Sequence, residues 1–331
     1  MTRFVRVLLV LLVTSALGCR AERTRPRPLA DAADPGDAGA NAPVLPDAFL
    51  PGPDPEDAAA PPIAEPGSDA STPPSPPPPD PLGELRCLTL GELRTSSDAR
   101  WGARLTDIVR HQTPAYGDTY YDADTVTYGH EATHGIHAYI RNTLDDTGQG
   151  ANGFYVMDGR ACLVREPRMR KSDVGAYVPA SLRWSRFDLY VTGASDWDDR
   201  PLYVWDEWVA YTNGAEVGVD RQRSGLWTEG WRGTVDGVIE LSVYAIAVGM
   251  AAEASEPGYF ERESNFRPFL AWNLRRAMRL FREGRVMPDF AWDEQDAYFE
   301  RFRSGAEAEA MRAFVRRVLG DGVADEILAP S

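Results

Sequence analysis

The apolar pattern is most regular in the last third of the chain, where it predicts three helices. Residues 239–254 are apolar at most positions, residues 269–282 place apolar side chains on one helical face, and residues 307–319 do the same before Gly320. The first stretch has about 14 apolar-rich residues, fewer than the roughly 20 that cross a bilayer. We therefore expect a buried helix there, within a helical C-terminal half.

Shorter apolar runs in the middle of the chain predict strands. Residues 154–164 are divided by Asp158 and Gly159, a dipeptide that favours the tight turn of a β-hairpin. Residues 187–191 form another short run of aromatic and apolar side chains, for which we expect a strand. A hairpin beside a helical half makes the expected fold class α+β.

Two more segments predict helices that mix polar with apolar residues. In residues 124–142, Asp124 can cap the first turn, and apolar residues follow at helical spacing. The second helix is expected to begin near Pro201, which suits a first helical turn, and to end at Gly214. These two helices carry most of the candidate functional side chains.

The N-terminal part of the chain differs from the rest in composition. Of the 26 prolines, 18 lie between residues 26 and 81. A segment rich in Pro, Ala and Asp cannot bury enough apolar surface to offset the entropy lost on ordering. We expect residues 20–84 to be a disordered tether and residues 85–331 to form the folded domain.

Residues 1–19 resemble the signal peptide of bacterial lipoproteins. Two arginines precede a short apolar run, and small residues then lead to Cys19. The resemblance implies a lipid on Cys19 and removal of residues 1–18, and Arg20 favours the outer membrane of a Gram-negative bacterium. An ordinary cleaved signal, in which Cys19 has no role, is the alternative.

Net charge and the remaining cysteines narrow the choice of partners. A formal charge of −15 argues against a nucleic-acid partner, because binding a phosphate backbone needs a basic surface. In an exported protein, the pair Cys87 and Cys162 favours one disulfide, with two free buried thiols as the alternative. Neither cysteine has the spacing to a second Cys or His that is typical of a metal ligand.

The strongest chemical signal is His130-Glu131-x-x-His134, in the first of the two mixed helices. Histidines four positions apart project from one face of a helix, so both can bind one metal ion. Glu131 lies beside them, where its carboxylate can take a proton from metal-bound water. His137 is one turn further along, which suits a supporting or packing role, and we expect His111 to be a solvated loop residue.

A catalytic zinc site of this kind needs a third protein ligand, and no histidine follows His137. A carboxylate is therefore expected, and Glu207 is the first candidate because tryptophans flank it in the second mixed helix. Burying such a glutamate is costly unless a cation meets it. The other candidate ligands are Asp206 and Glu216, and without a metal Glu207 would be partly exposed or paired with Arg183 or Arg186.

Together the two motifs resemble those of the gluzincin metallopeptidases. The run Asp206-Glu207-Trp-Val-Ala210 is similar to the segment around the third ligand in lethal-factor-type members. The resemblance implies a zincin-like fold, Glu131 as general base, and zinc bound by His130, His134 and Glu207.

One position departs from the family. Many gluzincins have an acidic residue four positions after the third ligand, where it supports a ligand histidine, but this chain has Tyr211. Support for the histidine is then expected from Tyr211, from Asn213 or from elsewhere in the chain.

The function expected from these features is zinc-dependent hydrolysis of a peptide bond in a peptide or protein substrate, by a membrane-anchored lipoprotein. Glu131 would activate the zinc-bound water, and a phenol would help to stabilise the oxyanion. Tyr211, Tyr203 and Tyr128 are the candidates for that phenol, and Tyr211 is taken as a catalytic candidate beside Glu131. The alternative is a non-catalytic cell-surface binding or scaffold lipoprotein with a structural or vestigial zinc.

Overall fold

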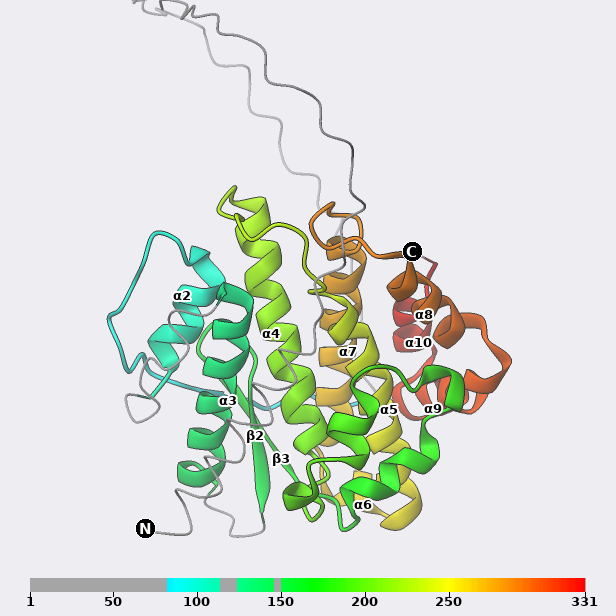
Figure 1. Cartoon of the computed structure of the whole chain (residues 1–331). Coiled ribbons are helices and arrows are strands. Elements are labelled where there is room, and N and C mark those ends of the chain that lie inside the picture. Colours follow the sequence, from blue (N-terminus) through cyan, green and yellow to red (C-terminus); the bar gives the residue numbers. More distant parts are fainter. Residues whose placement is uncertain (1–81, 114–123, 146–149, 331) are drawn as a thin grey trace, which may run out of the picture. The chain divides into compact units, whose positions relative to one another are not determined.

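The computed structural model describes residues 82–113, 124–145 and 150–330, all within one compact unit. The expected signal, Cys19 and nearly all of the expected tether lie outside the described residues. The described part is 62% helical and 6% strand, so the fold mixes helix and sheet, and helices predominate in more than the expected C-terminal half (Figure 1).

A small antiparallel sheet contains the expected hairpin. Its strands, in the spatial order β1-β3-β2, are β1 (Leu88–Thr89), β3 (Arg160–Arg165) and β2 (Ala151–Tyr155). Asp158 and Gly159 have φ angles of 55° and 65°, the left-handed conformation that a tight turn of this kind requires. The hairpin predicted over residues 154–164 is therefore confirmed.

Helices form the rest of the fold. The four longest are α3 (Thr125–Thr143), α4 (Tyr203–Arg223), α5 (Asp236–Ser255) and α7 (Phe266–Gly284). The others are α2 (Gly102–His111), α6 (Tyr259–Arg262), α8 (Asp293–Ser304), α9 (Glu309–Leu319) and α10 (Asp321–Ile327). Asp124 caps α3 by accepting a hydrogen bond from the Thr127 amide, as the sequence predicts.

Helix α4 crosses the middle of the molecule and packs against α3, α5 and α7 (Figure 1). The prediction that it ends at Gly214 is wrong, because the helix continues to Arg223. A β-carbon at Gly214 would lie 2.9 Å from the Val126 carbonyl oxygen and 3.3 Å from the His130 β-carbon. Gly214 therefore allows α3 and α4 to approach closely and does not terminate a helix.

The strand predicted over residues 187–191 is also wrong, because Phe187–Thr192 is a π-helical turn, η4. Its wide turn is closed by a bond of 2.8 Å from the Gly193 amide to the Asp188 carbonyl. The ammonium of Lys171 donates to the carbonyls of Tyr190 and Val191, which lie 3.1 and 2.7 Å away. A short apolar run does not by itself distinguish a strand from a helical turn.

Helix α5 is the central helix of the larger apolar cluster. It has 20 residues, so it is long and apolar enough to cross a membrane by length and composition, and the length argument made from residues 239–254 is wrong. The conclusion that this is a buried helix is instead supported by its packing, because 83% of its most apolar stretch is buried by the rest of the described chain.

A smaller apolar cluster joins α2 and α3 to the hairpin. His111 ends α2 within this region and is buried, with 6% of its surface exposed, so its assignment to a solvated loop is wrong. Its Nδ1 lies 2.8 Å from the Asp107 carbonyl oxygen and 2.9 Å from the Tyr155 hydroxyl. These contacts fix α2 to the hairpin, and they explain why a histidine is buried there.

Candidate metal centre

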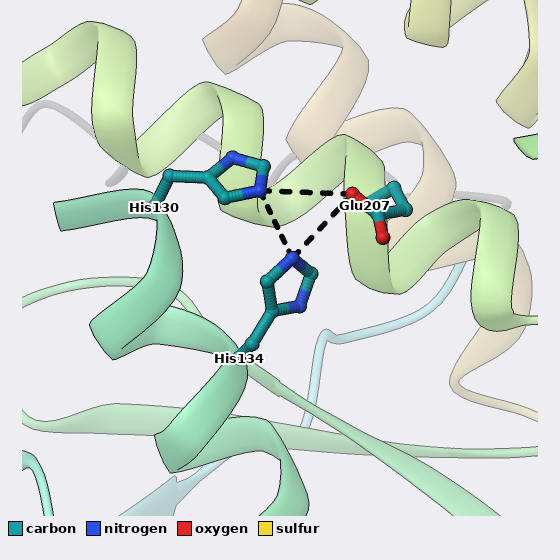
Figure 2. Close-up of side chains that lie close together, drawn as sticks. All are labelled: His130, His134 and Glu207. Carbon is teal, nitrogen blue, oxygen red and sulfur yellow. Dashed lines mark hydrogen bonds and ion pairs between the residues drawn. The ribbon is translucent and has the colours of Figure 1, made fainter. Parts of the chain in front are cut away.

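The structure brings His130 and His134 of α3 together with Glu207 of α4 (Figure 2). The two Nε2 atoms are 3.0 Å apart. Glu207 Oε2 lies 3.7 Å from His130 Nε2 and 3.4 Å from His134 Nε2. Three atoms that could bind a metal ion, from two helices, therefore converge on one point, as the motifs predict.

This triangle fits a tetrahedral metal ion. Ligands about 2.0–2.1 Å from a tetrahedral zinc lie roughly 3.4 Å from each other. The three observed edges of 3.0, 3.4 and 3.7 Å lie on both sides of that value. Without an ion, two imidazole nitrogens at 3.0 Å require a proton between them, and that proton occupies the position that a metal would take.

Glu207 has no compensating charge other than the two histidines. Its side chain is fully buried, and neither carboxylate oxygen has a hydrogen bond of good geometry among the described residues, although the Tyr203 phenol and the His134 imidazole are close enough to interact with it. The arginine partners considered from the sequence are engaged elsewhere: Arg183 donates to main-chain carbonyls, and Arg186 pairs with two other acids. A buried carboxylate in this state is stabilised by a bound cation.

Asp206 takes the supporting role that the sequence did not assign. Its Oδ1 lies 2.5 Å from Nδ1 of His134 and 3.0 Å from Nδ1 of His137, and Oδ2 accepts from Arg141 at 3.1 Å. Burial alone would raise the pKa of Asp206, but the charge of His137 and the hydrogen bond from His134 hold it well below its usual value. A carboxylate on the far nitrogen of a ligand histidine fixes the orientation of its ring.

The two ligand histidines have opposite pKa shifts. Burial, reinforced by the charge of His134, lowers the pKa of His130 well below its usual value. Burial acts against protonation of His134 too, but the carboxylates of Glu207 and Asp206 raise its pKa well above the usual value. His130 can therefore bind a metal directly, whereas His134 must first release a proton.

His134, His137 and Asp206 also form a compact group of potential ligands, at which we expect no second ion. Both imidazoles direct Nδ1 at the same oxygen of Asp206, which leaves that oxygen engaged twice. The guanidinium of Arg141 on the other oxygen would repel a second cation. His137 therefore has the supporting role that its position suggested, and the remaining candidate, Glu216, pairs with Arg276 instead.

The two expected catalytic side chains come from the same helices as the candidate ligands. Glu131 follows His130 on α3, is buried, and is not one of the three converging groups. The ring of Tyr211 lies perpendicular to that of His130, with 4.6 Å between centroids. Its hydroxyl is 3.2 Å from that of Tyr190, a neighbour that sequence reasoning missed because it belongs to the π-helical turn η4.

The other two tyrosines differ in position. Tyr203 lies one turn before Glu207 on α4, and burial followed by the charge of Glu207 raises the pKa of its phenol well above the usual value. Tyr128 packs its ring against Trp101 in the smaller apolar cluster. The structure therefore favours Tyr211 and Tyr203 over Tyr128 as neighbours of the metal ligands.

A narrow pocket opens beside His130. Thr127, Tyr211 and the segment of residues 232–234 also line it, and its volume of about 10 Å³ holds about one water molecule. Among the described residues, this pocket therefore leaves little free space beside His130.

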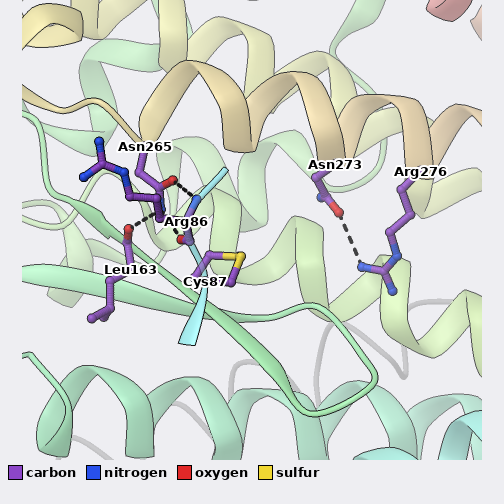
Figure 3. Close-up of a disulfide and its surroundings, with 7 residues drawn as sticks. Arg86, Cys87, Leu163, Asn265, Asn273 and Arg276 are labelled. Carbon is purple, nitrogen blue, oxygen red and sulfur yellow. Dashed lines mark hydrogen bonds between the residues drawn. A yellow bond between two sulfur atoms is a disulfide. The ribbon is translucent and has the colours of Figure 1, made fainter. Parts of the chain in front are cut away.

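Cys87 and Cys162 are joined in a disulfide, as the presence of two cysteines in the expected domain favoured (Figure 3). Cys87 precedes β1 and Cys162 lies in β3, so the bridge fixes the start of the domain to the sheet. Asn265, at the start of α7, accepts from the Arg86 amide and donates to the carbonyls of Arg86 and Leu163 (Figure 3). The bridge therefore belongs to the framework and is separate from the metal ligands.

Comparison with known proteins gives no relative from which a function could be transferred. No family model, no curated protein and no solved structure matches the chain. A function for this chain must therefore be argued from its own side chains.

Proposed function

We propose that residues 85–331 form a zinc-dependent peptidase that resembles the gluzincins and has a zincin-like fold. We further propose that the chain is exported and anchored to the outer membrane by a lipid on Cys19, with a disordered tether between. The observation that carries the proposal is Glu207, a buried carboxylate whose neighbours are the two histidines of an HExxH helix. A general base next to those histidines favours catalysis over a purely structural metal site.

Zinc, when bound, supplies a Lewis acid that polarises a carbonyl group and lowers the pKa of water. Glu131 accepts a proton from the attacking water and passes it to the leaving amine. Tyr211 donates a hydrogen bond to the carbonyl oxygen of the substrate as that oxygen gains negative charge. Asp206 binds Nδ1 of His134 and so keeps Nε2 of that ring directed at His130 and Glu207.

The variant Glu131→Gln tests the proposed base. It is expected to keep one zinc per chain and to lower the cleavage rate of a peptide library by about 10²- to 10⁴-fold, since the base is lost but no ligand is. Glu261→Gln, at an exposed position of α6, should change neither quantity. Full activity of Glu131→Gln would contradict the assignment of the base.

A non-catalytic scaffold or binding lipoprotein with a structural zinc is the second candidate. It is favoured by the small size of the pocket beside His130, which has room for about one water molecule. This alternative predicts a firmly held metal and no cleavage of any peptide in the library. Cleavage by the wild type that is lost in Glu131→Gln would exclude it.

A further inference from the structure

Three tryptophans that the proposed chemistry does not use lie together on the surface. The rings of Trp184 and Trp292 stack with 5.0 Å between centroids, and Trp231 stands at 85° to Trp292 at 6.3 Å. All three are partly exposed. We call this group the tryptophan corner (Trp184, Trp231 and Trp292).

The tryptophan corner adjoins the metal centre through two separate segments. Trp231 directly precedes residues 232–234, which line the pocket beside His130. Trp184 lies two residues before Arg186, whose guanidinium carbon is 4.9 Å from the ring centre of Tyr211. Both segments therefore connect the corner to side chains beside the candidate ligands.

The charges around the corner favour a basic ligand. Asp293 and Glu294 follow Trp292 at the exposed start of α8, and neither makes an ion pair with another described residue. Their neighbour Asp296, by contrast, is paired with Arg285.

The ring series already binds one guanidinium from this chain. Tyr298 stacks on the other side of the series, against Trp184 at 5.1 Å. The guanidinium of Arg301 lies over Tyr298 at 5.6 Å. At the opposite end, no described cation lies over Trp231 or Trp292. Among aromatic rings, indole attracts cations most strongly, and arginine is the commoner partner.

We propose that the tryptophan corner binds an arginine side chain of an extended peptide, held by the faces of Trp231 and Trp292 and by the carboxylates of Asp293 and Glu294. This inference rests on the proposed peptidase function, because it assigns that function a substrate class: peptides with a basic residue some positions from the cleaved bond.

The test measures binding without turnover. The full chain carrying Glu131→Gln and loaded with zinc is titrated into three fluorescein-labelled nonapeptides, each three repeats of Gly-Ser-Xaa with Xaa as arginine, norleucine or glutamate. Fluorescence anisotropy should show the arginine peptide binding at least about ten-fold tighter than the norleucine peptide, a preference that decreases at high salt.

Substitutions then locate the preference. Trp231→Leu keeps an apolar side chain but removes the ring, so it should reduce the preference for arginine several-fold, and a second substitution, Trp292→Leu, should abolish it. Trp272→Leu is the matched control, because Trp272 is also partly exposed but lies on α7 between Arg160 and Arg276. An equal affinity for the arginine and norleucine peptides, or a preference that survives the loss of both rings, would overturn the proposal.

The outcomes also separate this inference from the peptidase proposal. A wild-type protein that cleaves peptides with no preference for arginine would overturn the subsite alone. A protein that cleaves nothing, yet prefers arginine through Trp231 and Trp292, would keep the subsite and overturn the peptidase.

Discussion

Two glutamates on adjacent helices are equally buried but differ completely in their surroundings. Glu240 of α5 accepts hydrogen bonds from the Arg186 amide and the Tyr244 hydroxyl, both at 2.7 Å, and its Oε2 pairs with the Arg186 guanidinium at 2.9 Å. Glu207 of α4 has the imidazoles of His134 and His130 at 3.4 and 3.7 Å and the phenol of Tyr203 one turn earlier on the helix, and no described arginine pairs with it. Both side chains are 0% exposed.

This difference indicates what each glutamate does. A buried carboxylate that serves the fold is surrounded by donors and a cation, as Glu240 is. Glu207 is just as buried but has no arginine partner, and the imidazole nitrogens beside it are ligands that zinc prefers. We therefore interpret Glu240 as structural and Glu207 as a ligand for an ion.

The largest expected effect is an opposite response of the two sites to the same substitution. Glu207→Gln should weaken zinc binding by more than about 100-fold, and it should lower the stability of the metal-free protein only through the loss of the carboxylate that faces protonated His134. Glu240→Gln should leave zinc affinity nearly unchanged but destabilise the fold by about 1–3 kcal/mol for each buried donor that then faces an amide group. Competitive zinc titration and urea unfolding measure the two quantities. Equal effects of both variants on zinc binding would remove the distinction.

The next effect concerns the support of His134. Asp206→Asn should weaken zinc binding by about 10- to 100-fold, because the ring of His134 loses the carboxylate that orients it. Asp107→Asn is the matched control. Asp107 also accepts a hydrogen bond beside a histidine, from the Tyr155 hydroxyl near His111, but none of these residues makes a hydrogen bond or ion pair with a candidate metal ligand. Its zinc affinity should be that of the wild type. An Asp206→Asn protein with undiminished affinity would show that the orientation of His134 is set by other contacts.

A smaller effect tests the close approach of α3 and α4. Gly214→Ala should destabilise the protein by about 1–3 kcal/mol, because its β-carbon would lie 2.9 Å from a backbone oxygen of α3. Zinc affinity should decrease with it, since the two helices carry the ligands. Gly322→Ala in α10 has open space at the corresponding position and should cost nothing. Thermal unfolding of the two variants, with and without zinc, gives the comparison.

Another effect, visible only as a pH dependence, extends the comparison to a third buried carboxyl, Glu166. Burial raises the pKa of Glu166 to about 8 from 4.5, although the Leu202 amide donates to it. The folded protein then holds a proton that the unfolded chain releases, so stability decreases as pH rises from about 4.5 to 8, by at most about 1.4 kcal/mol per pH unit.

Glu166→Gln removes this titration and should flatten the pH dependence of stability in that interval. Glu84→Gln, at an exposed position, should leave the slope as in the wild type. Urea unfolding at several pH values measures the slope, and a Glu166→Gln protein with the wild-type slope would assign the pH dependence to other groups.

Local signals predicted much of the fold. The cap at Asp124 and the repeat of apolar residues after it predicted α3, and the Asp158-Gly159 dipeptide predicted the hairpin turn. Three C-terminal apolar stretches correspond to α5, α7 and α9. In each case the residues that determine the element lie within the element itself, so a single sequence suffices.

Contacts between distant segments account for the failures. Gly214 looked like a helix end, but it is a point of contact with α3, 80 or more positions earlier. The turn at residues 187–191 depends on Lys171, and the burial of His111 depends on Tyr155. At the candidate metal centre, the four-residue spacing of His130 and His134 and the tryptophans that flank Glu207 were sufficient to select the three converging side chains. The bond from His134 to Asp206 was not predictable in this way, because it depends on how α3 packs against α4.

The central claim is that the partner of Glu207 is a metal ion bound with His130 and His134. Zinc content per chain, measured by elemental mass spectrometry for the wild type and for Glu207→Gln, tests it most directly. We predict one zinc in the wild type and far less than one in the variant. A well-folded wild type without zinc, or a variant with a full complement, would contradict the assignment of this ligand set.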